Sequence, residues 1–285
     1  MGATPLALVI TGAIIHAYWN VQMKKARGGP GFIWLFTIVS VVALLPFGGM
    51  RSLELGTWLD ARLLGAAAAS AIIHVVYHNA LQLGYRTGDF STVYPIARGV
   101  APMLTVAGAA LLLAETVPLT NWIGAGAIAA GIVMLTFQRG TGGAASSRGV
   151  GWATLTGLSI AAYSLVDGWA ITDLHADPIA YYFVSQVFRV ILFAPAALMA
   201  FDSVRTAASV SLREVAIVGM LSPLAYLLAL LALQHAPVSQ VAPLREVSML
   251  FGALAGGLHF GERLGRARVL GIVAIGMGAL LVALR

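Results

Sequence analysis

The chain has 285 residues, of which 59% are hydrophobic and only 10% charged, with a formal net charge of +6 and no cysteine. A soluble domain carries about a quarter charged residues, so this composition excludes an ordinary water-soluble protein and indicates a polytopic membrane protein. The lack of cysteine excludes disulfides and thiolate metal sites, and the basic residues lie in short loops between apolar runs, which excludes a nucleic-acid-binding signature.

Apolar runs of roughly twenty residues recur along the whole chain, and each is long enough to cross about 30 Å of hydrocarbon. They are continuously apolar rather than alternating, which favours helices over a β-barrel. No room is left for a soluble domain. We therefore expect an all-α integral membrane protein with ten transmembrane helices, at residues 4–23, 31–50, 62–84, 91–113, 118–138, 150–171, 178–200, 213–235, 238–260 and 266–284.

A polar, flexible linker at 139–149 separates two similar units, residues 1–138 and 150–285. Each unit contains an arginine, a glutamate seventeen residues later, and two glycines beyond it. These residues are Arg98, Glu115, Gly124 and Gly131 in the first unit and Arg245, Glu262, Gly271 and Gly278 in the second. Five spans in each unit, an odd number, require the two copies to lie in opposite orientations. Such inverted repeats are typical of secondary transporters with a site near the bilayer midplane.

The basic residues are distributed unevenly over the two sides of this arrangement. Eleven of the seventeen fall in loops on one side, three fall on the other side, and three lie inside spans. The positive-inside rule places the richer side in the cytoplasm and both termini outside. Arginine far outnumbers lysine and alanine and glycine are abundant, which favours a bacterial protein and hence the bacterial inner membrane.

The first span carries a polar stripe. His16, Asn20 and Lys24 share one helix face, with Trp19 beside it, because residues three and four apart are neighbours on a helix. Polar groups facing lipid tails would be costly, so this stripe should line the bundle interior or a wet cavity. The structural alternative is hydrogen bonding between helices by His16 and Asn20, with Lys24 reaching the headgroups.

The third span repeats the pattern with His74, Tyr77 and His78. Two histidines four residues apart can bind a metal, but no acidic residue or third histidine lies nearby in sequence, so we expect no metal and no cofactor. Stacking on a substrate and proton uptake are the better interpretations, since histidine changes charge near neutral pH.

Charged residues inside the predicted spans give the strongest signal. There are three arginines and two carboxylates: Arg98, Arg189 and Arg245, with Asp167 and Glu246. An arginine at the bilayer centre costs at least about 2.5 kcal/mol, so each needs a partner. Internal salt bridges are one interpretation, with Asp167 pairing one arginine and Glu246 another. One cation is then left over, which favours an anionic substrate group such as a carboxylate, whose geometry suits the arginine fork.

The two five-helix units, each with a proline-containing fourth helix that leads to a glutamate and a glycine-rich fifth helix, resemble the EamA-type transporters of the drug/metabolite transporter superfamily. The segments HAYWNVQMKK, YRTGDFSTVYPIARGVAP and LREVSMLFGALAGGLHFGE carry this resemblance, which covers about 5–137 and 150–284. It implies ten helices, alternating access and ATP-independent export or exchange of small metabolites or drugs. Small multidrug members couple protons through a glutamate in the first helix, where this chain has His16, so that mechanism does not carry over.

Together these features predict a secondary active transporter, an exporter of a small zwitterionic or anionic metabolite such as an amino acid, with its site between the two repeats. Arg98 and Arg245 would hold the anionic end. The other expected contacts are walls from Trp19, Tyr77 and Tyr94 and polar groups or proton acceptors from His16, Asn20, His74 and His78. Asp167, Arg189 and Glu246 are expected in charge pairs or in coupling. Proton coupling and facilitated exchange are both compatible with the sequence, and we expect a monomer, with oligomers left open.

The sequence leaves two alternatives to this function. A multidrug or amphiphile exporter of the same superfamily is the nearest alternative. A membrane-embedded enzyme acting on a lipid-linked substrate is more remote, because it would need a convergent nucleophile or metal cluster and the sequence shows neither. We therefore expect that the protein is not an enzyme.

Overall fold

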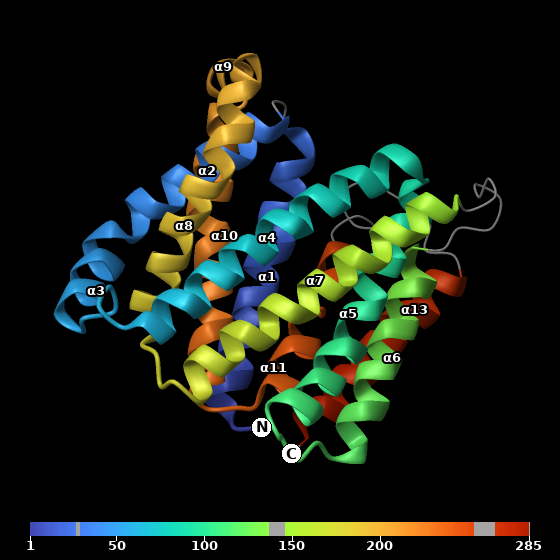
Figure 1. The fold of residues 1–285 in the computed structure, drawn as a ribbon. Helices are drawn as coiled ribbons and strands as arrows, with labels where there is room; N and C mark the ends of the chain where they lie inside the picture. The colour runs from blue at the N-terminus through green and yellow to red at the C-terminus, as the bar shows by residue number, and fades with distance from the viewer. Residues whose placement is uncertain (27–28, 137–145, 254–265, 285) are drawn as a thin grey trace.

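The computed structural model describes residues 1–26, 29–136, 146–253 and 266–284, and within these ranges the chain forms helices and turns but no strand (Figure 1). The first half contains α1 (Ala3–Lys25), α2 (Gly29–Leu44), η1 (Leu45–Gly49), α3 (Met50–Glu54), α4 (Ala61–Thr87), α5 (Phe90–Leu112) and α6 (Leu119–Thr136). The second half contains α7 (Ser147–Thr172), α8 (Pro178–Met199), α9 (Phe201–Val210), α10 (Leu212–Leu233), α11 (Val238–Arg245) and α13 (Arg266–Ala283).

Eight described helical segments are long and apolar enough to cross a membrane. They are Ala3–Met23, Gly29–Glu54, Ala61–Thr87, Thr92–Leu112, Ser147–Thr172, Pro178–Met199, Leu212–Leu233 and Arg266–Ala283. A ninth apolar segment, Leu119–Leu135 within α6, is shorter. The protein is therefore an all-helical, multi-pass membrane protein, whereas the total of ten spans stays a prediction.

The predicted ninth span, 238–260, is not one continuous helix. α11 ends at Arg245, Glu246 and Val247 form a turn, and residues 248–253 are helical again. Pro243 lies inside α11, two residues before its end, and its ring removes one backbone donor and crowds the turn that precedes it. At the turn, backbone hydrogen bonds reach back three residues instead of the four of an α-helix. The Glu246 N–H donates to the Pro243 carbonyl and the Val247 N–H to the Leu244 carbonyl, both at 3.1 Å. Residues 254–260 of this predicted span, and Glu262, lie outside the described residues.

The predicted linker at 139–149 ends earlier than expected, because its last residues belong to a helix. α7 already begins at Ser147, because the Ser146 hydroxyl accepts a hydrogen bond from the Gly149 N–H at 3.0 Å and so caps the helix. Residues 139–145 lie outside the described part of the chain.

α9 forms in a segment that the sequence predicts to be a connector between two spans. Val204 and Ala207 are buried on one side of this short helix, which packs against α2. At the start of α2, the Gly31 N–H donates to the Ser203 hydroxyl at 2.9 Å. A ten-residue segment is too short to be predicted as a membrane span, and its polar residues are typical of a connector.

Helices from the two halves pack on each other. The principal pairs are α1 with α10, α4 with α7, and α6 with α13. The Met1 ammonium donates to the Ala283 carbonyl at 3.0 Å, so both ends of the chain lie at the same end of the bundle, and α9 lies at the opposite end (Figure 1).

The contact between α6 and α13 depends on the four glycines of the repeat motif. A β-carbon at Gly278 would lie 2.5 Å from the Gly124 carbonyl oxygen, and one at Gly271 would lie 2.8 Å from that of Gly131. Since the earlier glycine of one helix faces the later glycine of the other, the two helices run antiparallel. Small residues let the backbones approach this closely, a common device where helices pack in lipid.

This close packing can be tested with two glycines of α13. We expect Gly278→Ala to destabilise the purified protein by about 1–3 kcal/mol, because the added methyl group would collide with the α6 backbone. Gly276→Ala is the matched control, since a β-carbon there meets nothing within 4 Å. Thermal unfolding in detergent would compare them, and equal losses in the two variants would contradict the described interface.

Candidate functional site

Five polar side chains from four segments meet in one cavity at the centre of the bundle. They are His16 from α1, Arg98 from α5, Tyr226 from α10, and Arg245 and Glu246 at the end of α11. Small residues of α1 and α10 complete the wall. The cavity measures about 20 Å³, which is room for about one water molecule. The helices are therefore closed around these groups in this conformation.

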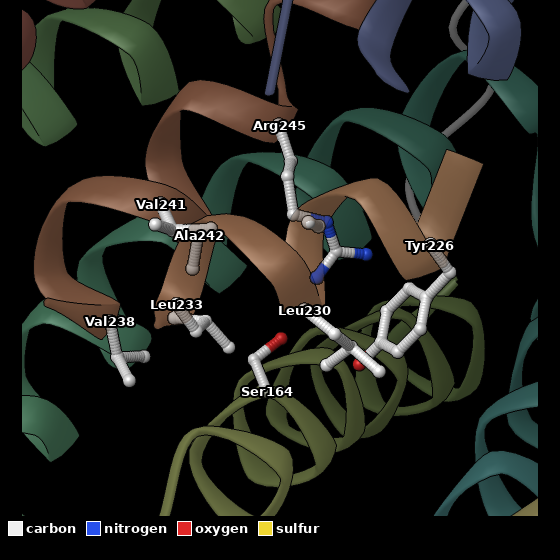
Figure 2. Close-up of a pocket in the computed structure, with 9 residues that line it drawn as sticks. Ser164, Tyr226, Leu230, Leu233, Val238, Val241, Ala242 and Arg245 are labelled. Carbon is white, nitrogen blue, oxygen red and sulfur yellow. The ribbon is translucent and has the colours of Figure 1, made fainter. Parts of the chain in front are cut away.

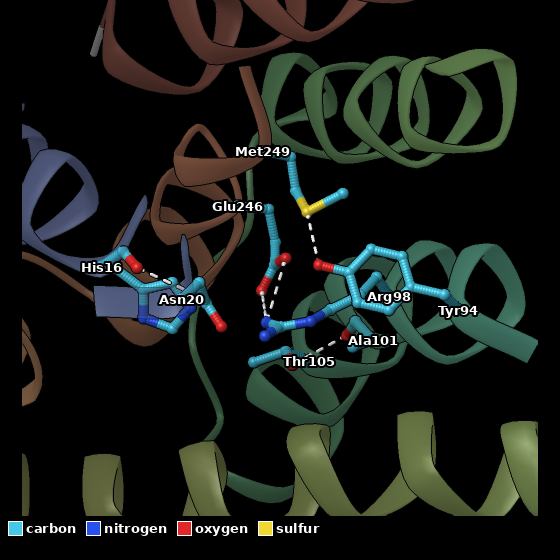
Figure 3. Close-up of polar contacts among 8 residues, drawn as sticks. All are labelled: His16, Asn20, Tyr94, Arg98, Ala101, Thr105, Glu246 and Met249. Atoms are coloured by element: carbon cyan, nitrogen blue, oxygen red, sulfur yellow. Dashed lines mark hydrogen bonds and ion pairs between the residues drawn. The ribbon is translucent and has the colours of Figure 1, made fainter. Parts of the chain in front are cut away.

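Arg98 and Glu246 form an ion pair across this cavity (Figure 3). A single nitrogen, Nη1, lies 3.3 Å from one carboxylate oxygen and 3.4 Å from the other. A charge-assisted hydrogen bond is usually about 2.7–2.9 Å long, so this contact is loose and does not use the two-nitrogen fork. The side chains are nonetheless nearly buried, at 11% and 7% exposure.

Arg245 is held by aromatic rings. Its Cζ lies 4.6 Å from the ring centroid of Tyr226 and 6.0 Å from that of Tyr163, within the range of cation–π attraction. It makes no ion pair with any carboxylate of the described residues. Its guanidinium also borders a second, mostly apolar cavity, where it extends between Ser164 and Tyr226 (Figure 2). Arg245 thus separates a polar cavity from an apolar one.

Asp167 does not pair with an arginine, contrary to one of the interpretations of the sequence. Its carboxylate accepts a hydrogen bond from the Tyr181 hydroxyl at 2.7 Å and another from the Tyr226 hydroxyl. Two hydroxyl donors satisfy this buried carboxylate, which is only 1% exposed, without a counter-charge beside it. Tyr226 therefore connects the two charges, with its ring under Arg245 and its hydroxyl on Asp167.

Arg189 lies elsewhere, between α8 and α4. Its Nη2 is 3.0 Å from Nδ1 of His74, and its Cζ lies 5.6 Å from the ring centroid of Tyr182. The same His74 nitrogen is 2.8 Å from the Ser70 carbonyl oxygen. It cannot accept from Arg189 and donate to Ser70 at once, so the tautomer of His74 selects one of these two bonds.

The predicted stripe on α1 is only partly in the cavity. His16 lines it, with its ring 4.6 Å from that of Trp19 in an edge-on contact. Asn20 donates instead to the His16 carbonyl of its own helix at 2.9 Å. The ring nitrogens His16 Nε2 and Trp19 Nε1 are buried without a hydrogen-bond partner among the described residues. The side chain of Lys24 lies outside that part of the structure.

The predicted residues of α4 form an aromatic layer beside the cavity rather than its wall. His74 stacks on Tyr163 at 4.0 Å between ring centroids, and Tyr77 lies 6.2 Å from Tyr163. His78 Nδ1 is 2.7 Å from the His74 carbonyl oxygen, which satisfies it within its own helix. These histidines belong to no group of three metal-binding side chains among the described residues.

The predicted site residue Tyr94 and the repeat-motif residue Glu115 both make structural contacts. The Tyr94 hydroxyl donates to the Met249 sulfur at 3.1 Å (Figure 3). Glu115 caps the start of α11, since its two carboxylate oxygens accept from the N–H groups of Val238 at 2.7 Å and Ser239 at 3.0 Å. A carboxylate is favourable there because helix N-termini carry partial positive charge.

Sequence reasoning missed Tyr226, which touches more of the site than any single predicted residue. A signal was present: it is the one aromatic residue in α10, in a run made mostly of leucine and alanine. Its importance became visible only when the packing of α10 against α1 and α7 placed it between Arg245 and Asp167.

Comparison with known proteins places this geometry in context. Residues 147–284 match the model of the EamA-like transporter family. No curated protein matches the chain in sequence. A solved structure described as "Crystal structure of protein" is similar over 100% of this chain and 98% of its own, with a TM-score of 0.72 and 13% sequence identity. At that identity the likeness concerns the fold alone.

The hydroxyl bonds to Asp167 make a stability prediction. Tyr181→Phe should cost about 2 kcal/mol, the usual worth of a hydrogen bond to a charged group, because it removes one of the two donors of a buried carboxylate. Tyr77→Phe is the control, since its hydroxyl makes no hydrogen bond to another described residue while its ring lies in the same aromatic layer. Thermal unfolding of both variants measures the difference. Equal midpoints would show that the bond to Asp167 contributes nothing.

Proposed function

Over residues 147–284 the chain belongs to the EamA-like transporter family, and on this premise we propose that it is a secondary active transporter that exports a small zwitterionic or anionic metabolite. The family makes the protein a membrane transporter of the drug/metabolite superfamily. An amino acid or a close relative is the substrate that best suits the charges in the central cavity.

The observation that carries this proposal is the position of Arg245. It borders the central cavity, lies over two aromatic rings and forms no ion pair with a described carboxylate. A cation in the middle of a lipid-embedded bundle is costly unless something compensates it. A substrate carboxylate would supply that compensation through a two-nitrogen contact, for which the arginine fork is suited.

The closed cavity is compatible with alternating access. A space of about 20 Å³ is too small for a metabolite, so the substrate must enter when helices separate. The turn at Glu246 and Val247 supplies a place where the ninth segment can change direction without breaking a regular helix. In this proposal His16, Arg98 and Arg245 contact substrate, whereas Trp19, Asn20, His74, Tyr77, His78 and Tyr94 form the layer behind them.

Transport by the purified protein in liposomes tests the proposal. Counterflow of labelled amino acids or carboxylates should exceed that of protein-free liposomes, whereas lipophilic cations should not move. An imposed pH gradient separates proton coupling from exchange, since only a coupled transporter accumulates substrate against its gradient. If lipophilic cations alone moved, the protein would be a multidrug exporter and the proposal would be wrong.

The orientation in the bacterial inner membrane is a second part of the proposal. The positive-inside rule places both termini outside and α9 in the cytoplasm. The natural chain has no cysteine, so single-cysteine variants report one position each. In intact cells, a membrane-impermeant maleimide should label Leu284→Cys, while Arg205→Cys on α9 should react only after permeabilisation. The reverse pattern would invert the topology.

A further inference from the structure

Two consecutive residues of opposite charge face the central cavity. Arg245 is the last residue of α11 and Glu246 the first residue of the turn that follows it, and both line the cavity. Their α-carbons are neighbours along the chain, about 3.8 Å apart. A cation and a carboxylate are therefore presented side by side at the break in this segment.

Neither Arg245 nor Glu246 has a close, two-point ion pair in this structure. Arg245 lies over the rings of Tyr226 and Tyr163 and has no carboxylate partner among the described residues. Glu246 has one ionic partner there, Arg98, and the contact of 3.3–3.4 Å uses a single nitrogen. A carboxylate offers about four lone-pair sites, so Glu246 keeps capacity for further donors.

We propose that this pair makes the site selective for zwitterions: Arg245 binds the carboxylate of the substrate and Glu246 binds its ammonium group. The inference rests on the proposed transport function and narrows its substrate from zwitterionic or anionic compounds to zwitterionic ones. Adjacent ammonium and carboxylate groups, as in an α-amino acid, match adjacent residues of opposite charge.

A zwitterion can use both charges of the pair, whereas a simple anion uses only Arg245. A carboxylate bound to Arg245 lies close to the Glu246 carboxylate, and an ammonium group placed between the two carboxylates reduces their repulsion. The ammonium group of a zwitterion supplies three donors for a carboxylate that Arg98 holds only loosely. Glu246 thus converts a general anion site into one that also requires an amine.

The sequence has this adjacent arginine–glutamate pair in only one of the two repeats. Arg98 occupies in the first unit the place that Arg245 has in the second, but Gly99 follows it where Glu246 follows Arg245. Arg98 therefore has no carboxylate next to it in the chain and uses Glu246 from the other half. The two arginines have unequal roles: both face the substrate, but Arg245 binds its carboxylate, whereas Arg98 also holds Glu246 until the ammonium group arrives.

Matched ligand sets test this selectivity. Leucine, phenylalanine and alanine would each be compared with the corresponding deaminated acid and decarboxylated amine, as competitors of counterflow in liposomes. The wild type should bind the amino acid and neither truncated analogue. Glu246→Gln should lower the preference for the amino acid over its deaminated acid by about tenfold or more, the loss expected for one hydrogen bond between charged groups. Glu54→Gln, an exposed carboxylate on α3, is the control and should keep the preference.

A double variant separates recognition from structural support. Glu246→Gln alone leaves Arg98 without its ion-pair partner, which could disturb folding, whereas Arg98→Gln with Glu246→Gln removes both charges. The double variant should still lack the preference for the amino acid. If it regained that preference, Glu246 would be only the counter-ion of Arg98 and the inference would be overturned.

Wild-type protein that takes the deaminated acid as well as the amino acid would also overturn the inference, while leaving the transport proposal intact. Movement of none of these ligands would instead contradict the transport proposal itself.

Discussion

The structure depends on one constraint: a charge buried in a lipid-embedded helix bundle must be compensated from within the bundle. The three arginines inside the spans meet it in different ways. Arg98 has the Glu246 carboxylate, Arg189 has His74 and the ring of Tyr182, and Arg245 has two tyrosine rings. Ring faces attract a cation less strongly than a carboxylate does, so Arg245 is the charge with most to gain from an anionic ligand.

Tyr226 links this incompletely compensated cation to the rest of the protein. Its ring lies under Arg245 and its hydroxyl binds Asp167, which Tyr181 of α8 also holds. A substrate that draws Arg245 away from the ring would therefore act on α7, α8 and α10 through one residue. The turn after α11 carries Arg245 and Glu246 and adds a place where the chain can bend. In the proposed transport cycle, binding and helix movement would share the same few side chains.

The sequence predicted the described membrane helices to within a few residues, because twenty-residue apolar runs determine them directly. It also located the buried charges, since they stand out in such runs. It did not predict their partners: the pairing of Asp167 with tyrosines depends on which helix faces meet. Nor did the sequence predict that the helices around two corresponding prolines would differ. α5 continues through Pro95, whereas α11 ends shortly after Pro243. α9 was missed because its amphipathic pattern spans only ten residues.

The most direct test of the account is thermal unfolding of wild type and Arg245→Gln, each with and without the amino acid that counterflow identifies. The account predicts that the variant without ligand unfolds at least as high as the wild type, because a poorly compensated buried cation has been removed. It also predicts that the ligand stabilises the wild type and not the variant. A ligand-induced shift that survives in Arg245→Gln would contradict the central role given to this residue.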